Sequence, residues 1–274
     1  MKPTYWQKQS IDKPLFPGML WSRPENRQLA GKLLIVGGSA HGFAAPAEAY
    51  TQAEKAGAGV TRVILPSALA KTIGRIFEAG EYAPSTPSGS FAQQALAEIL
   101  SLSQWSDAVL LAGDFGRNSE TAILLEKLVE KYHSTLTLTG DAIDYFLAAP
   151  RQVLTREYTV LALTFSQLQK LASAAHATQP FTSQLDLVHF TAALHSFSEQ
   201  YPASYLLVQH LGQIFVAANG AISSTAVTGS PAIPVTTAPT NTLQTSTHAT
   251  VWYMQNPSQP YEALTTSLVG SAKL

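Results

Sequence analysis

The chain has 274 residues, a formal net charge of −1 and no cysteine. Hydrophobic residues make up 46% and charged residues only 13%, which favours a folded globular protein over a disordered one. The lack of cysteine excludes disulfides, thiol catalysis and cysteine-ligated metal. The sequence contains no Lys/Arg run and no apolar run near the ~20 residues of a membrane span. We therefore expect a cytoplasmic protein without nucleic-acid or membrane partners.

The first 30 residues are rich in proline and carry Trp6, Phe16 and Trp21. This composition predicts an extended arm whose aromatic side chains pack on its own domain or on a neighbouring subunit. Residues 31–274 are expected to form a single α/β domain.

A short apolar run at 33–36 predicts a buried strand, which Gly37-Gly-Ser39 then interrupts. A helical pattern begins near Pro46, a residue common in the first turn of a helix. Such a turn brings backbone close to a ligand and presents free N–H groups of the helix. The stretch matches neither the dinucleotide-binding nor the P-loop fingerprint. A tight turn without any ligand remains the alternative.

The same alternation of strand, loop and helix continues along the chain, which predicts a mostly parallel sheet covered by helices on both faces. Capping-box spacing at Thr164–Gln167 opens one helix. Asn219-Gly220 predicts a late β-hairpin, and 229–241 is expected to be a loop. Strands are expected at 33–36, 60–65, 107–112, 135–138, 152–155, 205–208, 214–217 and 221–224. Helices are expected at 45–55, 67–77, 91–102, 119–131, 182–200, 242–254 and 260–271.

Ligands of such folds bind at the carboxyl ends of the parallel strands. The loops expected to form a site therefore follow Val36, Ala112, Leu138, Thr155 and Val208, together with the start of the helix near residue 242. No cluster of acidic and histidine residues has the spacing of a metal site, so none is predicted.

Several of these loops carry motifs in a characteristic order. Ile35-Val-Gly-Gly-Ser39, Ala45-Pro46 and Ala56-Gly-Ala-Gly59 are similar to I-G-G-S, G-A-P and A-G-A-G, and Ala112-Gly-Asp-Phe-Gly-Arg117 and Thr139-Gly-Asp-Ala-Ile143 are similar to G-P-G-L-G-R and D-A-D-A-L. In this order the motifs resemble those of the ADP/ATP-dependent NAD(P)H-hydrate dehydratases. The resemblance implies a ribokinase-like fold, here a three-layer α/β/α sandwich.

The resemblance also implies ligands and the residues that bind them. Hydrated NADH or NADPH would be the substrate, and ADP or ATP, with Mg²⁺, the nucleotide. The substrate side would use Gly37, Gly38, Ser39, Ala45, Gly116 and Glu157. The nucleotide side would use Gln209, His210, Gly212, Gln213, Asn241 and Thr242. Relatives of this kind are often multimeric, so a homo-oligomer is expected.

The C-terminal half departs from the family motifs. The T-P-H-x-G-E motif is compared with Thr155-Arg-Glu-Tyr-Thr-Val160, and L-K-G with Val208-Gln-His210. The G-x-G-D motif, which implies a phosphate loop and a catalytic Asp, is compared with Pro239-Thr-Asn-Thr242. A threonine hydroxyl is no general base near neutral pH, and losing a positioned base costs ~10²–10⁴-fold in rate.

Two functional hypotheses follow. The first is a divergent dehydratase in which Asp114, Asp141 or Glu157 replaces the missing carboxylate. For each of these acids a role as a loop or cap residue is the more common explanation. The second is a non-catalytic relative that binds a nucleotide or dinucleotide, or that is an assembly scaffold and binds no cofactor. A small-molecule kinase of the same fold would need the same missing Asp.

Overall fold

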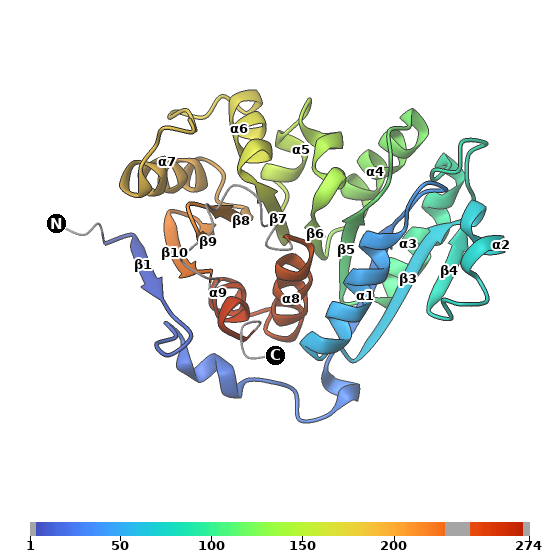
Figure 1. Ribbon diagram of the computed structural model, residues 1–274, viewed down its shortest axis with the longest axis horizontal. Helices are drawn as coiled ribbons and strands as arrows, with labels where there is room; N and C mark the ends of the chain where they lie inside the picture. The colour runs from blue at the N-terminus through green and yellow to red at the C-terminus, as the bar shows by residue number, and fades with distance from the viewer. Residues whose placement is uncertain (1–3, 228–241, 271–274) are drawn as a thin grey trace.

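The computed structural model describes residues 4–227 and 242–270. Its centre is a ten-stranded sheet with the spatial order β1-β10-β9-β8-β7-β6-β5-β2-β3-β4 (Figure 1). Neighbouring strands are parallel except at the β8–β9 and β9–β10 pairs, which form the expected late hairpin. The strands are β1 (Trp6–Gln9), β2 (Lys32–Gly37), β3 (Val60–Pro66), β4 (Gly80–Ala83), β5 (Ala108–Gly113), β6 (Thr135–Leu138), β7 (Thr159–Thr164), β8 (Ser204–His210), β9 (Gln213–Ala218) and β10 (Ala221–Ala226).

Helices cover both faces of the sheet, which confirms the three-layer α/β/α architecture. The α-helices are α1 (Ala44–Ala56), α2 (Ala70–Ile73), α3 (Leu96–Trp105), α4 (Ser119–Lys131), α5 (Arg151–Leu154), α6 (Phe165–Ala174), α7 (Leu187–Gln200), α8 (Thr242–Gln255) and α9 (Pro260–Gly270). Helices α1, α8 and α9 pack together on one face, and α3, α4, α6 and α7 cover the other. None of the helices in residues 4–227 and 242–270 is long and apolar enough to cross a membrane.

Alternating side chains of β2 divide the core into its two layers. Leu33 and Ile35 face α1 and α8, whereas Leu34 and Val36 join the cluster beneath α3, α4, α6 and α7. All four side chains are fully buried. This is why the central strands read as continuous apolar runs, as expected for a sheet covered on both faces.

The helix ends follow local signals in the sequence. Gly57 ends α1 in the left-handed conformation, with φ of 84°. The Asn118 side chain accepts from the backbone N–H groups of Glu120 and Thr121 at the start of α4. Thr164 and Gln167 form the predicted capping box of α6.

Some predicted elements are wrong. Residues 152–155 lie in and beside helix α5, and the strand of this region is β7, which begins at Thr159. A four-residue apolar run does not separate a strand from a helix turn, and Pro150 here begins a helical turn. The expected helix at 67–77 is shorter, a 3₁₀ turn followed by α2, and β4 follows it.

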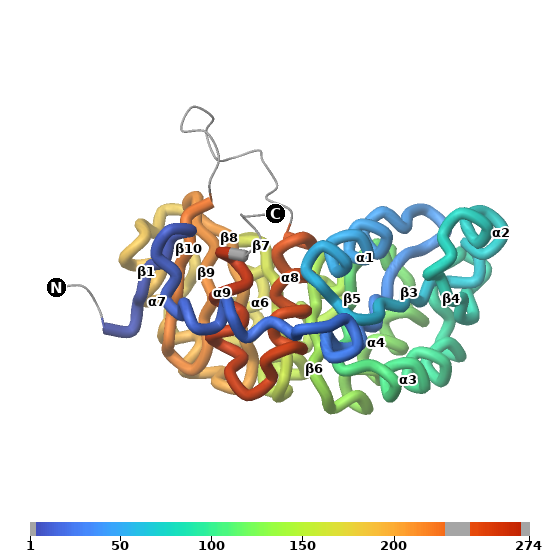
Figure 2. The backbone as a smooth tube through the Cα atoms, turned by 90° about the horizontal axis from the view of Figure 1, so that it is seen from below, coloured from blue at the N-terminus to red at the C-terminus, as the bar shows by residue number. Residues whose placement is uncertain are grey.

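The N-terminal arm contributes a strand that the sequence did not predict. Strand β1 pairs with β10, and the Gln9 amide nitrogen donates to Thr225 Oγ1 at 2.8 Å and to the Thr265 carbonyl at 2.6 Å. The arm then runs along the helical layer of α8 and α9 to reach β2 (Figure 2). The loop expected at 229–241 lies outside the described residues.

Candidate functional site

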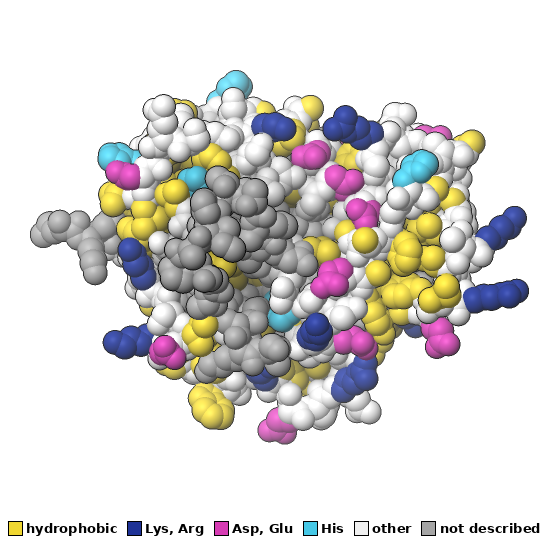
Figure 3. Space-filling model, in the orientation of Figure 1, with side chains coloured by type: hydrophobic (Ala, Val, Ile, Leu, Met, Phe, Trp, Pro, Cys, Tyr) yellow, Lys and Arg dark blue, Asp and Glu magenta, His cyan; other side chains and the backbone are white. Residues whose placement is uncertain are grey.

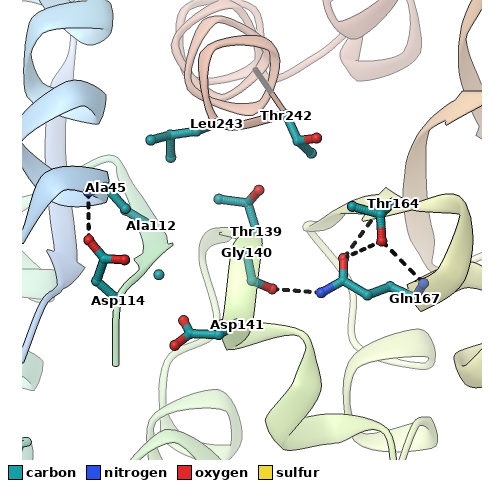
Figure 4. A pocket seen from close by; sticks show the side chains of 11 residues that line it. Ala45, Ala112, Asp114, Thr139, Gly140, Asp141, Thr164, Gln167, Thr242 and Leu243 are labelled. Carbon is teal, nitrogen blue, oxygen red and sulfur yellow. Dashed lines mark hydrogen bonds between the residues drawn. The ribbon is translucent and has the colours of Figure 1, made fainter. Parts of the chain in front are cut away.

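A cavity of about 590 Å³, which we call the central pocket, opens at the carboxyl ends of β5, β6 and β7 (Figure 4). This is the edge of the sheet where the order of the strands and loops predicts a ligand site. The starts of α1, α6 and α8 close the pocket around the strand ends. The residues that line it are Ala45, Ala112, Gly113, Asp114, Thr139, Gly140, Asp141, Thr164, Gln167, Thr242 and Leu243.

The glycine turn after β2 supports the central pocket but does not line it. Gly37, Gly38 and Ser39 are all absent from its lining residues. A Cβ on Gly37 would lie 2.6 Å from the Gly113 carbonyl oxygen, so this strand end requires glycine. Gly38 has φ of 90°, and its N–H donates to the same carbonyl at 2.9 Å. Ser39 is buried and forms a two-way backbone bridge with Gly42. The turn fixes the start of α1, where Ala45 lines the pocket.

Asp114 holds the end of β5 against α1. Its backbone is left-handed, with φ of 60°, a conformation that Asp tolerates better than most residues. Its Oδ2 accepts a hydrogen bond of 2.7 Å from the Ala45 N–H in the first turn of α1. A carboxylate here is favourable because the N-terminus of a helix is electropositive. Asp114 therefore has a structural role in addition to lining the pocket.

Asp141 also lines the central pocket, just after β6 and on the same side as Asp114 (Figure 4). Its carboxylate accepts from the N–H groups of Gly116, at 3.1 Å, and Phe115, at 3.4 Å. Burial raises the pKa of Asp141, and the negative charges of Asp114 and Asp144 raise it further, while the two backbone hydrogen bonds act in the opposite direction. A carboxyl group with a raised pKa beside a cavity is a candidate for proton transfer.

The other walls of the central pocket are polar but uncharged. The Gln167 amide nitrogen donates to the Gly140 carbonyl at 2.8 Å and to Asp144 Oδ1 at 3.1 Å, which ties α6 to the β6 loop. The buried Thr139 hydroxyl has no hydrogen-bond partner among the described residues. Thr242 and Leu243, at the start of α8, face the strand ends across the pocket (Figure 4).

A second cavity of about 650 Å³, which we call the side pocket, adjoins the central pocket and shares Asp141 with it. It is lined by Gly116, Arg117, Asn118, Ser119, Asp141, Asp144, Tyr145, Leu147 and Lys170. The Tyr145 hydroxyl donates to the Gly116 carbonyl and fixes the floor of this pocket. Acidic side chains gather between α1 and α5 on the face shown in Figure 3, and basic side chains stand at its upper rim.

Glu157 does not belong to either pocket. It is exposed in the turn that precedes β7, at the amino end of that strand and hence at the opposite edge of the sheet. The error follows from the misplaced strand at 152–155. The loop that follows β7 begins at Thr164, so the six-residue T-P-H-x-G-E motif is better compared with Thr164–Gln169. There the threonine is present and the proline, histidine and glutamate are absent.

The residues expected to bind the nucleotide do not all lie in one place in the structure. Gln209, His210 and Gln213 form the ends of the paired strands β8 and β9, and Gly212, with φ of 69°, is in the turn between them. None of these four lines the central or the side pocket. Thr242 does line the central pocket, and Asn241 lies outside the described residues.

His210 is part of an aromatic cluster next to α6. Its ring stacks on Phe165 with centroids 3.9 Å apart and tilts against Phe190 at 4.7 Å. Burial lowers its pKa, so the imidazole is held neutral near pH 7. These contacts explain His210 as a packing residue of the β8–β9 hairpin.

Sequence reasoning missed Gln167 and Lys170 as site residues. Gln167 was recognisable as a capping residue, but its contact with the β6 loop depends on the long-range packing of α6. Lys170 lies one turn further along α6, and only the correct placement of β7 shows that this helix starts at the site. No group of three acidic or histidine residues within the described ranges has the geometry of a metal site.

Comparisons with known proteins agree with the motif resemblance. No family model matches the chain. Over 191 residues it is 29% identical to the bifunctional NAD(P)H-hydrate repair enzyme Nnr of Methanothermobacter thermautotrophicus, an alignment that covers 68% of this chain and 35% of the relative. The chain therefore spans about a third of the length of that relative.

Solved structures share the fold over nearly the whole chain. A ribokinase-like superfamily protein from Enterococcus faecalis superimposes with a TM-score of 0.72 at 16% identity, covering 98% of this chain and 87% of that one. The ADP/ATP-dependent NAD(P)H-hydrate dehydratase of Bacillus subtilis, co-crystallised with ATP and Mg²⁺, gives a TM-score of 0.60 at 10% identity, covering 95% and 87%. The chain has the ribokinase-like fold, and its sequence is similar to that of an NAD(P)H-hydrate repair enzyme.

Proposed function

We propose that this chain is a divergent NAD(P)H-hydrate dehydratase in which Asp141 performs the proton transfer for which the start of α8 has no carboxylate. The family resemblance supplies the substrate class, a hydrated NADH or NADPH, and the nucleotide, ADP or ATP. The observation that carries the proposal is the position of Asp141, which lines both pockets and has a raised pKa.

The other two candidate acids are less suitable. Asp114 is committed to the first turn of α1 through its 2.7 Å hydrogen bond from Ala45. Glu157 lies at the opposite edge of the sheet. Asp141 also accepts two backbone N–H groups, but a carboxylate has about four acceptor sites, so it can still take a proton from a ligand. A raised pKa makes it a stronger base than an ordinary Asp.

The nucleotide is expected at the other side of the central pocket. Helix α8 starts there with Thr242 and Leu243, and free N–H groups at the start of a helix favour a phosphate. The buried, unpartnered Thr139 hydroxyl at the pocket wall offers a polar contact to a ligand or to a bound water. Phosphate oxygens of the nucleotide would supply ligands to Mg²⁺, since no cluster of three acids or histidines is present in the described residues.

The second candidate function is binding without catalysis. One observation favours it: Thr242, not an acid, lies where the family resemblance implies the catalytic Asp. In that case the pocket would bind the dinucleotide or the nucleotide and return both unchanged.

We also propose that the chain forms a homo-oligomer. Trp21 on the arm is 88% exposed and Ile76 after α2 is 83% exposed, and large apolar side chains of this kind favour a contact with a second copy. Sedimentation velocity of the full chain tests this; a monomer at every concentration would contradict it.

The activity is tested by the recovery of NADPH absorbance from hydrated NADPH, with ADP and ATP supplied in turn with Mg²⁺. We expect turnover that requires a nucleotide. The Asp141→Asn variant should lose ~10²–10⁴-fold in rate because it removes the base. Glu157→Gln is the matched control, because it neutralises an exposed acid at the other edge of the sheet, and it should keep the wild-type rate.

Binding measurements on the wild-type protein distinguish the enzyme from the binding function. Calorimetry that detects binding of hydrated NADPH or of ATP, without any turnover, would establish the binding function and overturn the enzyme. A wild-type rate in Asp141→Asn would show that another group transfers the proton.

A further inference from the structure

The side pocket has two cations among its lining residues. Arg117 and Lys170 are both exposed and both line it. Neither forms an ion pair with a carboxylate of the described residues. Arg156 is a contrast: it is partly buried, and it donates to the carbonyls of Val129, Ser134 and Glu157. Arg117 and Lys170 are therefore available to a ligand, whereas Arg156 supports the fold.

The side pocket adjoins the central pocket, and Asp141 lines both. Each cavity is within the ~300–1,000 Å³ typical of small-molecule sites. A ligand longer than one cavity, with its reacting ring beside Asp141, would extend into the side pocket. A dinucleotide has this length, since it joins two nucleotides through phosphates.

The polar groups of the side pocket match a ribose linked to a phosphate. Lysine and arginine are the usual partners of phosphate, lysine as a point charge and arginine as a bidentate donor. Asp144 is a second carboxylate in this pocket, and one of its oxygens already accepts from Gln167 at 3.1 Å. A carboxylate repels a phosphate but accepts hydrogen bonds from ribose hydroxyls. The mixture of two cations and an acceptor therefore fits a sugar phosphate better than a bare anion.

We propose that the side pocket binds a ribose-phosphate segment of the dinucleotide, with Arg117 and Lys170 pairing with the phosphate and Asp144 accepting from the ribose. The proposal rests on the dinucleotide being the ligand of the central pocket. The phosphate belongs either to the bridge between the two nucleotides, which NADH and NADPH share, or to the 2′ position, which NADPH alone carries.

The test is calorimetric titration of the full chain with hydrated NADH and hydrated NADPH. The site variant is the double substitution Arg117→Gln/Lys170→Gln. The matched control is Lys71→Gln/Arg75→Gln, which removes the same charge from exposed positions in and beside α2. We expect the dissociation constant of the site variant to rise by about 10–100-fold, the usual effect of losing two charge-assisted hydrogen bonds. The control should bind like the wild type.

Two further readouts sharpen the result. Wild-type binding should weaken as KCl is raised, and the site variant should lose most of this dependence, because exposed charges are screened by salt. Asp144→Ala should weaken binding of hydrated NADH, whose ribose hydroxyls are free. Equal losses for both dinucleotides would assign the bridging phosphate; a loss for hydrated NADPH alone would assign the 2′-phosphate.

Failure of this proposal differs from failure of the dehydratase activity. If the wild type turns over hydrated NADPH but Arg117→Gln/Lys170→Gln binds it as tightly as the control, the side pocket is not the phosphate site. If the wild type binds both dinucleotides through Arg117 and Lys170 but turns over neither, the side-pocket assignment stands and the enzyme is overturned. If neither dinucleotide binds the wild type, both proposals are wrong.

Discussion

The two sides of the central pocket are built in different ways. On the side of β2, β5 and β6, main-chain and carboxylate groups interlock: the Gly38 N–H reaches the Gly113 carbonyl, and Asp114 and Asp141 each hold a neighbouring loop. On the side of α8 and the β8–β9 hairpin, Thr242 and Leu243 line the pocket but the hairpin residues do not. The motif resemblance is therefore strongest where the motifs shape the backbone of the loops. It is weakest where they would bind phosphate and supply the catalytic Asp.

The largest expected loss of stability comes from disrupting the side of β2, β5 and β6. Gly37→Ala places a methyl group 2.6 Å from the Gly113 carbonyl oxygen, so β2 or β5 must shift. We expect a loss of about 3 kcal/mol in the free energy of unfolding, the upper range for overpacking. Denaturant titration measures it. Gly18→Ala is the control, since a Cβ there has no atom within 4 Å, and a similar loss in both variants would contradict the interlock.

The contact between α8 and α1 is expected to make the free energy of unfolding depend on pH. His248 of α8 is buried, and its Nε2 lies 3.2 Å from Oε1 of Gln52 on α1. Burial, together with the positive charges of Arg23 and Lys55, lowers its pKa to about 4. Below pH ~6.5 His248 becomes protonated in the unfolded chain but stays neutral in the folded chain. The free energy of unfolding therefore falls as the pH falls.

Between pH 7 and pH 5 this linkage amounts to a loss of about 2 kcal/mol. Unfolding free energies of the wild type and of His248→Gln at the two pH values measure it, and the variant should lose this part of the pH dependence. His41→Gln, at an exposed position, should keep it. An unchanged pH dependence in His248→Gln would show that other groups produce it.

Placing an acid at the start of α8 tests the role of that side of the pocket. Thr242→Asp places a carboxylate at the start of a helix, where it is electrostatically favourable, and opposite the strand ends. We expect about a tenfold gain in rate, well below the ~10²–10⁴ of an ideally placed base, because the rest of the family motif is absent. Thr242→Asn is the control of equal size. A lower rate in Thr242→Asp than in Thr242→Asn would contradict the role inferred for this position.

The smallest effect concerns Asp114. Asp114→Ala removes the acceptor of the Ala45 N–H and should cost about 1 kcal/mol in stability, the typical value of a lost helix cap. Asp114→Asn keeps an oxygen acceptor and should cost less. If Asp114→Asn instead abolished turnover while leaving stability intact, the proton transfer would have to be assigned to Asp114.

The sequence predicted most of the central strands and long helices, missed β1 and β4, and predicted the site in part. Long periodic segments such as α4, and the glycine turn that leads into α1, carry strong local signals. The short runs at 152–155 and in β1 do not, because four residues are compatible with either a strand or a helical turn. That one misplaced strand moved Glu157 into the predicted site and left out Gln167.

The candidate acids could not be ranked from the sequence. Asp114 and Asp141 occupy similar loops after neighbouring strands, and both are compatible with a cap or a catalytic role. Their difference lies in long-range geometry: Ala45 is 69 residues from Asp114 and donates to its carboxylate, whereas Asp141 is placed between two pockets. Such contacts are made by the fold and leave no local pattern.

The most direct test of the role of Asp141 is the pH dependence of kcat/KM for hydrated NADPH. The base form must be unprotonated, so the rate should fall as the pH falls through the pKa of Asp141. Burial raises that pKa, so the falling limb should lie above the ~3.9 of an ordinary Asp, and it should be absent from the residual rate of Asp141→Asn. The same limb persisting in Asp141→Asn, or a rate that does not change over the acid range, would contradict the account.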